Sequence, residues 1–303
     1  MTQRRYSSAL IIVAILAAAL LVYSAREELL EAIGNASILF LGLVYLATLT
    51  QNVTLWLVFH SSIGAGNRYL DTAKMHFGGQ VAKYLPGKVW GLVYQATLKS
   101  DSMPVGHIVQ GNIVLYAMGI VSVFFTSAAL IAYPISVSLA TVILVAGAAV
   151  SAFCMSSHHL YRVIQRFSRL SARFELTSDT PRTDFSIATR VAVYLILILT
   201  YALSNVFLLN AFFDVDIHQA LRLSAYLGIA WLAGVIVAIS PSGLGVREAV
   251  FIGIGYVSDE TSFEMYASIA LVARVIQVLQ DLASAFLVPA IVGMFFSRSR
   301  HPA

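Results

Sequence analysis

The stretch SPSGLGVRE, at positions 240–248, interrupts a long apolar region with one proline, two glycines and two charged side chains. A comparable break, YLPGK, occupies positions 84–88 in the N-terminal half. Proline and glycine interrupt helices, and breaks at matching positions of two halves indicate the midplane site of an inverted-repeat transporter. We therefore expect the two breaks to face each other inside a membrane and to hold an anionic headgroup.

The composition of the whole chain is that of a membrane protein. Of its 303 residues, 59% are hydrophobic and 11% are charged, and the mean hydropathy is +0.82. A soluble domain carries about a quarter charged residues. Apolar runs recur from end to end, without the alternating polarity of barrel strands. We expect an all-α, polytopic helical membrane protein that forms a single transmembrane domain over residues 1–303.

Two kinds of apolar segment alternate along the chain. Both arms of the broken segment 71–98 are too short to cross a hydrocarbon core of about 30 Å, and so is the second arm, 246–256, of the broken segment 220–257. The two segments are therefore predicted to form re-entrant hairpins. The halves 38–154 and 189–296 then match with opposite orientation, as an inverted repeat. Six unbroken runs are predicted to span the membrane: 8–23, 38–59, 107–132, 137–154, 189–209 and 264–296.

The distribution of basic residues predicts the orientation of these helices. Arg4 and Arg5 precede the first run, the loop 156–185 is rich in arginine, and Arg298 and Arg300 follow the last run. By the positive-inside rule, both termini are expected to be cytoplasmic. The first run also resembles a signal peptide, and we expect it to be a retained helix.

Several classes of chemistry have no support in the sequence. The single Cys154 excludes an internal disulfide and a multi-cysteine metal site, and no nucleotide-binding or metalloprotease motif occurs. The basic residues fall in loops and at membrane edges, so the net charge of +4 does not indicate a nucleic-acid partner. We expect no cofactor and no metal.

The hairpin turns are the first candidates for a binding site. Each turn exposes the N-terminus of its second half-helix, which favours an anion. Each turn also carries a cation, Lys88 in the first and Arg247 in the second, and Lys83 lies just before the first break. Three glycines at the breaks would let a ligand approach the backbone closely: Gly87, Gly243 and Gly245.

The last predicted helix contributes further polar residues. Arg274, Gln277 and Asp281 are spaced to share one helical face, and charges inside a membrane usually mark a functional cavity or a partner. The embedded cations outnumber the embedded acids: Lys83, Lys88, Arg247 and Arg274 against Glu248 and Asp281. Such an electropositive cavity suits a phosphate, which arginine grips with two hydrogen bonds and lysine attracts as a point charge.

A purely structural interpretation of these polar residues is also open. Arg247 with Glu248, or Arg274 with Asp281, would form buried pairs that lock the hairpin to the last helix. The polar stretch TLTQNVT at 48–54 presents the same choice. Its side chains either join neighbouring helices, or Gln51 or Asn52 lines the cavity.

Two motifs resemble a known family. The segments KYLPGKVWG at 83–91 and GLGVREA at 243–249, together with Arg274, resemble the lysylphosphatidylglycerol synthase transmembrane region family, a family of flippase-like integral membrane proteins. The resemblance covers most of the chain and implies lipid translocation by a stand-alone member that lacks the synthase domain and is not an enzyme. The first motif departs from the commoner Pro-Gly-Arg-x-Gly pattern at Lys88 and Trp90, so an aminoacylated lipid is not the implied cargo.

The resulting hypothesis is a translocase for an anionic lipid, either a polyprenyl-phosphate-linked sugar or a phospholipid. One alternative is a non-transporting partner of a lipid or polysaccharide assembly complex, whose enzymes would in either case be candidate partners. Another is an integral-membrane enzyme that acts on a lipid-linked substrate. Its catalytic acid or base would be one of the carboxylates predicted at the membrane edges: Asp71, Asp101, Asp214, Asp216 and Glu264.

Overall fold

The computed structural model describes residues 23, 34, 36–64, 68–85, 89–99, 103–155, 185–237, 243, 245–258 and 263–296. Within these ranges the ordered elements are helices and no strand occurs, which confirms the all-α prediction. The helices are α3 (Ile38–Ser62), α4 (Tyr69–Ala82), α5 (Trp90–Thr97), α6 (Val105–Ala132), α7 (Val137–Cys154), α10 (Ile187–Phe212), α11 (Ile217–Ile236), α12 (Val246–Ser258) and α13 (Phe263–Phe296).

Six of the described helices are long and apolar enough to cross a membrane: α3, α6, α7, α10, α11 and α13. Five of them match predicted spans to within a few residues. Of the run 8–23 only residue 23 is described, and residues 86–88, 238–242 and 244 of the predicted hairpins lie outside the described residues. The first arm of the second predicted hairpin corresponds to α11, whose 20 residues are long enough by themselves to cross the membrane.

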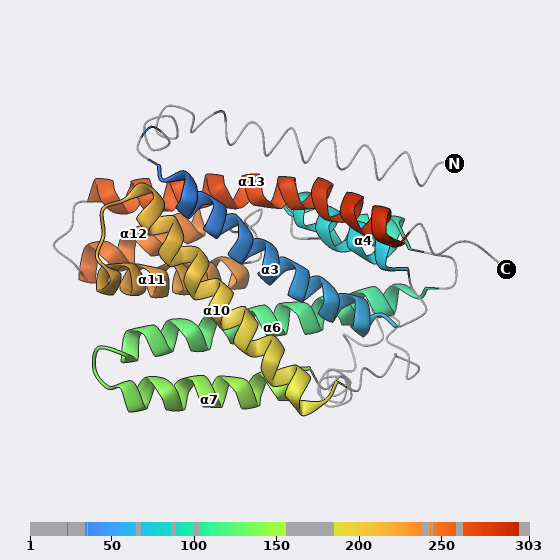
Figure 1. Cartoon of the computed structure of the whole chain (residues 1–303), viewed down its shortest axis with the longest axis horizontal. Helices are drawn as coiled ribbons and strands as arrows, with labels where there is room; N and C mark the ends of the chain where they lie inside the picture. The colour runs from blue at the N-terminus through green and yellow to red at the C-terminus, as the bar shows by residue number, and fades with distance from the viewer. Residues whose placement is uncertain are drawn as a thin grey trace.

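The short helices form two hairpins that lie at opposite ends of the bundle. Helix α4 packs on α5, and α11 packs on α12. With 14, 8 and 13 residues, α4, α5 and α12 are about 21, 12 and 20 Å long, shorter than the hydrocarbon core. Figure 1 shows α4 along one half of α13 and α11 and α12 along the other half. The hairpins therefore approach the middle of α13 from opposite directions.

Most helix contacts of one half of the chain have a counterpart in the other half, although the contact of α3 with α6 has no extensive counterpart between α10 and α13. An exchange of the two halves pairs α3 with α10, α4 with α11, α5 with α12 and α6 with α13. Under it, the contact of α4 with α13 corresponds to the contact of α11 with α6, and both are extensive. Helices α3 and α10, which the exchange interchanges, pack directly on each other. Helix α7 lies outside this scheme and packs on α6 and α10.

Side-chain caps define where several helices begin. The Asp216 carboxylate accepts hydrogen bonds from the backbone N–H groups of His218 (2.8 Å) and Gln219 (3.0 Å) at the start of α11. These bonds favour the ionised form and hold the pKa of Asp216 below its usual range. The Ser186 hydroxyl accepts from the N–H of Thr189 at the start of α10 in the same way. The caps satisfy backbone donors that the helices cannot satisfy themselves.

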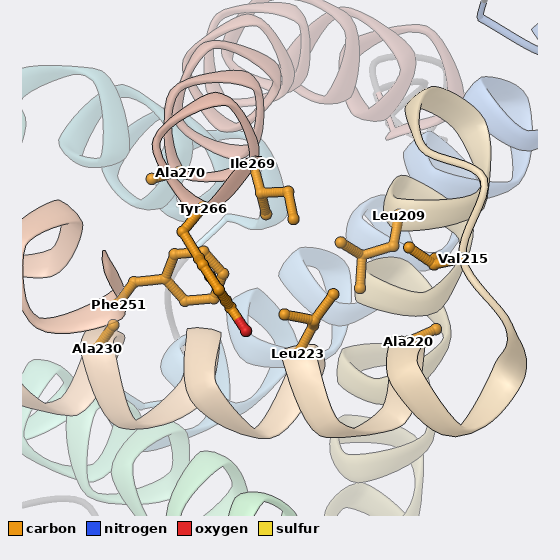
Figure 2. Packing of buried hydrophobic residues seen from close by; sticks show 9 residues of the cluster. All are labelled: Leu209, Val215, Ala220, Leu223, Ala230, Phe251, Tyr266, Ile269 and Ala270. Carbon is orange, nitrogen blue, oxygen red and sulfur yellow. The ribbon is translucent and has the colours of Figure 1, made fainter. Parts of the chain in front are cut away.

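A buried apolar cluster holds the second hairpin against α10 and α13 (Figure 2). At its centre, the rings of Phe251 on α12 and Tyr266 on α13 meet edge to face, with centroids 5.6 Å apart. Both side chains are almost completely buried. The cluster comprises Leu209, Val215, Ala220, Leu223, Ala230, Phe251, Tyr266, Ile269 and Ala270. Close packing of this kind stabilises helix association in a membrane, where the lipid supplies little hydrophobic driving force.

The contact between α11 and α6 depends on Gly228, and this dependence can be tested. A Cβ atom at Gly228 would clash with the Ser127 hydroxyl on α6 and lie 2.7 Å from the Tyr201 hydroxyl on α10. We expect Gly228→Leu to destabilise the fold by about 1–3 kcal/mol through overpacking. Thermal unfolding in detergent measures the effect. Gly253→Leu is the control, because a Cβ atom there would have no described neighbour within 4 Å. Equal melting temperatures for the two variants would contradict the packing shown.

Candidate functional site

The two hairpins meet at the midpoint of α13. Lys83 caps the C-terminal end of α4, and its Nζ lies 2.8 Å from Oδ2 of Asp281. On the other hairpin, Arg247 lies in the first turn of α12 and donates from Nη1 to Oε1 of Gln277, at 3.3 Å. Gln277 and Asp281 flank the midpoint of α13. The structure therefore brings together residues from both broken segments and the last helix, as the sequence predicted.

Asp281 is the acceptor for the first hairpin. Besides pairing with Lys83, its Oδ2 accepts a hydrogen bond of 2.6 Å from the Tyr84 hydroxyl. The Lys83 ammonium also donates to Oε1 of Gln80, at 2.9 Å. Lys83 thus points into the bundle. The Tyr84 side chain is buried, and its hydroxyl also holds the counter-ion of Lys83.

Two arginines converge on Gln277 at the second hairpin. The Nη1 atoms of Arg247 and Arg274 lie 3.3 and 3.4 Å from the same Gln277 carbonyl oxygen. Oε1 of Glu248 lies 3.9 Å from Nε of Arg274, a charge contact without hydrogen-bond geometry. Among the described residues, Nε of Arg247 and Oε2 of Glu248 are buried without a hydrogen-bond partner. These atoms remain available to a ligand or to water.

The observed ion pairs differ from those of the structural interpretation. That interpretation joined Arg247 to Glu248 and Arg274 to Asp281, whereas the structure pairs Lys83 with Asp281 and Arg274 with Glu248. The reason is geometric. Adjacent residues on one helix point in different directions, so Glu248 reaches Arg274 while Arg247 lies against Gly234 and reaches Gln277. Asp281 lies two turns beyond Arg274, beside the end of α4.

Arg247 is held in a slot between two glycines. A Cβ atom at Gly234 would lie 2.5 Å from Cγ of Arg247, and one at Gly243 would lie 2.8 Å from its Nε. The guanidinium also lies over the Trp231 ring, 5.7 Å from its centroid. Gly243 and Gly245 have φ angles of 74° and 79°, a conformation that other residues rarely adopt. Gly243 thus makes room for an arginine, whereas the space around Gly245 is open.

These charged side chains line a central cavity of about 540 Å³. Its walls come from α3, α4, α6, α10, α11, α12 and α13. Lys83, Arg247 and Arg274 face it, with the carboxylates Glu248 and Asp281. In the part of the chain that the structure describes, the cavity therefore holds three cations against two acids. The predicted contributions of Lys88 and Gly87 fall outside that part.

Neutral polar residues complete the lining. Both Gln51 and Asn52 face the cavity, in agreement with the prediction that one of them lines it. The hydroxyls of Thr50 and Thr54 instead bond to the backbone of their own helix. Sequence reasoning missed other lining residues, although several are polar side chains isolated within apolar helices. These are Gln80, Tyr116, Tyr201, Ser204, Asn205, Trp231 and Gln280.

The fold and the cavity define a polytopic helical membrane protein with a charged site at its centre. Comparison with known proteins adds no relative, because no family model, curated sequence or solved structure matches the chain. The resemblance of its two motifs to the lysylphosphatidylglycerol synthase transmembrane region stays an expectation that comes from the residues alone.

The ion pair of Lys83 with Asp281 can be tested by a double-mutant cycle. We expect Asp281→Leu to destabilise the protein by about 3 kcal/mol, because it leaves a largely buried ammonium without its counter-ion. Lys83→Met combined with Asp281→Leu should recover part of this loss, since it removes the uncompensated charge. Melting temperatures in detergent give the comparison. A double variant no more stable than Asp281→Leu would show that the pair does not couple the two helices.

Proposed function

We propose that this protein is a membrane lipid translocase that moves an anionic lipid through its central cavity. The cargo would be a polyprenyl-phosphate-linked sugar or a phospholipid. One observation carries the proposal: cations from both hairpins and from α13 converge on one cavity at the midpoint of the bundle. The proposal agrees with the expectation drawn from the two sequence motifs.

The electrostatics of the cavity favour an anionic occupant. A cation inside a membrane is costly unless it is paired, and the described lining has one cation more than it has acids. The buried Nε of Arg247, without a described partner, offers a hydrogen-bond donor for a phosphate oxygen. A phosphate between Arg247 and Arg274 would offset the repulsion of two guanidinium groups that share a single amide oxygen.

The architecture supports movement of that occupant. The hairpins reach the cavity from opposite ends of the bundle, so a change in the packing of one half against the other would open the site to either side in turn. The phosphate would visit the cavity while the acyl or prenyl chains stay in lipid. In this proposal the protein lies in the cytoplasmic membrane with both termini in the cytoplasm, and lipid or polysaccharide assembly enzymes are its candidate partners.

The position of the other carboxylates favours a translocase over an enzyme. A catalytic acid or base must lie within hydrogen-bond reach of the reacting group. Asp71, Asp214, Asp216 and Glu264 do not line the cavity, and Asp216 is engaged in capping α11. Asp101, the fifth candidate, lies outside the described residues. The two acids that do face the cavity, Glu248 and Asp281, lie against Arg274 and Lys83.

A reconstituted transport assay tests the proposed function. Purified protein in liposomes should move labelled phospholipid or polyprenyl-phosphate lipid between leaflets, and Arg247→Gln or Lys83→Gln should slow this transport at least about tenfold, because each removes a charged donor worth about 1.5–3 kcal/mol. Lys74→Gln is the matched control, because Lys74 is an exposed cation on α4 that does not line the cavity. Absence of transport for both lipid classes, or equal loss in the control, would refute the proposal.

A further inference from the structure

The cavity contains amide side chains that the charged cluster does not use. Gln51 and Asn52 on α3 and Gln280 on α13 face it, and we refer to these three as the free amides. Gln280 is only 9% exposed. No hydrogen bond within the described part of the chain involves the side chain of any of the three. Gln51 and Asn52 are half-buried, and none of the three amides has a completely buried polar atom without a partner, so their polar atoms open into the cavity and are available to a ligand there.

Other amides in the same bundle behave differently. The Asn112 side chain bonds to Gln95 on α5, at 2.6 Å, and so joins two helices. Asn205 and Asn210 on α10 each bond to a carbonyl of their own helix, at 2.9 Å. These contacts are typical of polar side chains that support a membrane bundle. The free amides make no such contact among the described residues, and unlike Gln110 on α6, whose buried amide is also without a described partner, they face the cavity.

The chemistry of an amide indicates what the free amides would bind. An amide offers a carbonyl acceptor and an NH₂ donor, whereas a phosphodiester can only accept hydrogen bonds. The cations Lys83, Arg247 and Arg274 already provide donors for a phosphate, and an amide carbonyl gains nothing from it. A hydroxyl group both donates and accepts, so it can satisfy both ends of an amide. The complementary ligand is therefore one that carries several hydroxyl groups.

The position of the free amides fits a group attached to the bound phosphate. Gln280 precedes Asp281 and lies one turn beyond Gln277, so it borders the cationic cluster. Gln51 and Asn52 reach the same cavity from α3. Its volume of about 540 Å³ is within the range of sites for whole small molecules, about 300–1,000 Å³, and exceeds the need of a phosphate alone.

We propose that the free amides recognise a polyhydroxylated group, a sugar or a comparable polyol, that is joined to the lipid phosphate. This inference rests on the proposed function and narrows its cargo to lipids with a phosphate-linked polyol. The polyol could be carried by a polyprenyl chain or by diacylglycerol. The site would recognise the phosphate-linked polyol that both kinds of lipid share. The experiment below distinguishes the two lipid anchors.

Two pairs of lipids of equal charge test the proposal. The first pair is a polyprenyl phosphate carrying one hexose and polyprenyl methyl phosphate. The second pair is phosphatidylinositol and phosphatidylmethanol. In each pair both members are phosphodiesters, and only one carries hydroxyl groups. Dissociation constants for the purified full chain, measured by native mass spectrometry in detergent, should be at least about tenfold lower for the polyol member of one or both pairs.

Variants connect the preference to the free amides. Gln51→Leu and Gln280→Leu should each weaken binding of the polyol lipid about tenfold and leave binding of its methyl ester unchanged. Asn210→Leu is the control, because this amide bonds to its own helix and does not line the cavity. It should bind all lipids as the unaltered chain does. If a variant fails to fold, the lipid comparison on the unaltered chain still decides.

The outcomes separate this inference from the proposed function. A preference in both pairs, or in the pair with one anchor only, supports the inference, and the second result also identifies the anchor. Equal binding of polyol lipids and methyl esters overturns the inference while the translocase proposal stands. If none of the four lipids binds, both proposals fail.

Discussion

A charged side chain that is buried in the bundle needs a counter-charge, and Asp281 in the middle of α13 provides the main one in this structure. Asp281 accepts from Lys83 and Tyr84 at the end of the first hairpin, and Gln277 accepts from Arg247 at the start of the second. Because an uncompensated charge in a membrane interior is so costly, these contacts determine where the hairpins can end. The two halves correspond in architecture but differ in the charges they bring to the cavity. Helix α6 is the counterpart of α13, yet the part of α6 that lines the cavity carries no charge.

Much of this arrangement could be predicted because it depends on local features of the sequence. Apolar length and the breaks at 84–88 and 240–248 indicated the hairpins, and helical spacing placed Arg274, Gln277 and Asp281 on one face. The ion pairs could not be predicted in this way. Tyr84 and Asp281 are separated by 197 positions, and only the packing of α4 on α13 brings them together. Sequence spacing instead suggested Arg274 as the partner of Asp281.

Isolated polar residues in apolar helices set a second limit to prediction. Asn205 and Asn210 lie on the same helix and both donate to its backbone, yet only Asn205 also faces the cavity. The difference arises from how α10 is rotated against α3 and α11, which no local pattern specifies. The second hairpin was predicted to begin at residue 220, whereas α11 begins at Ile217, because Asp216 caps it there.

Helix α7 has no counterpart when the helices of the two halves are paired, and this bears on how an inverted repeat can be built. In the predicted inverted repeat, each half contains two crossings and one hairpin that returns to its own side, so each half begins and ends on the same face of the bilayer. Two such halves joined directly would share one orientation. A single additional crossing between them would reverse the second half, and in the described part of the chain α7 is the helix that is long and apolar enough to provide it. In such a repeat an odd number of crossings between the halves, rather than a contact with the cavity, accounts for a helix that does not line the site.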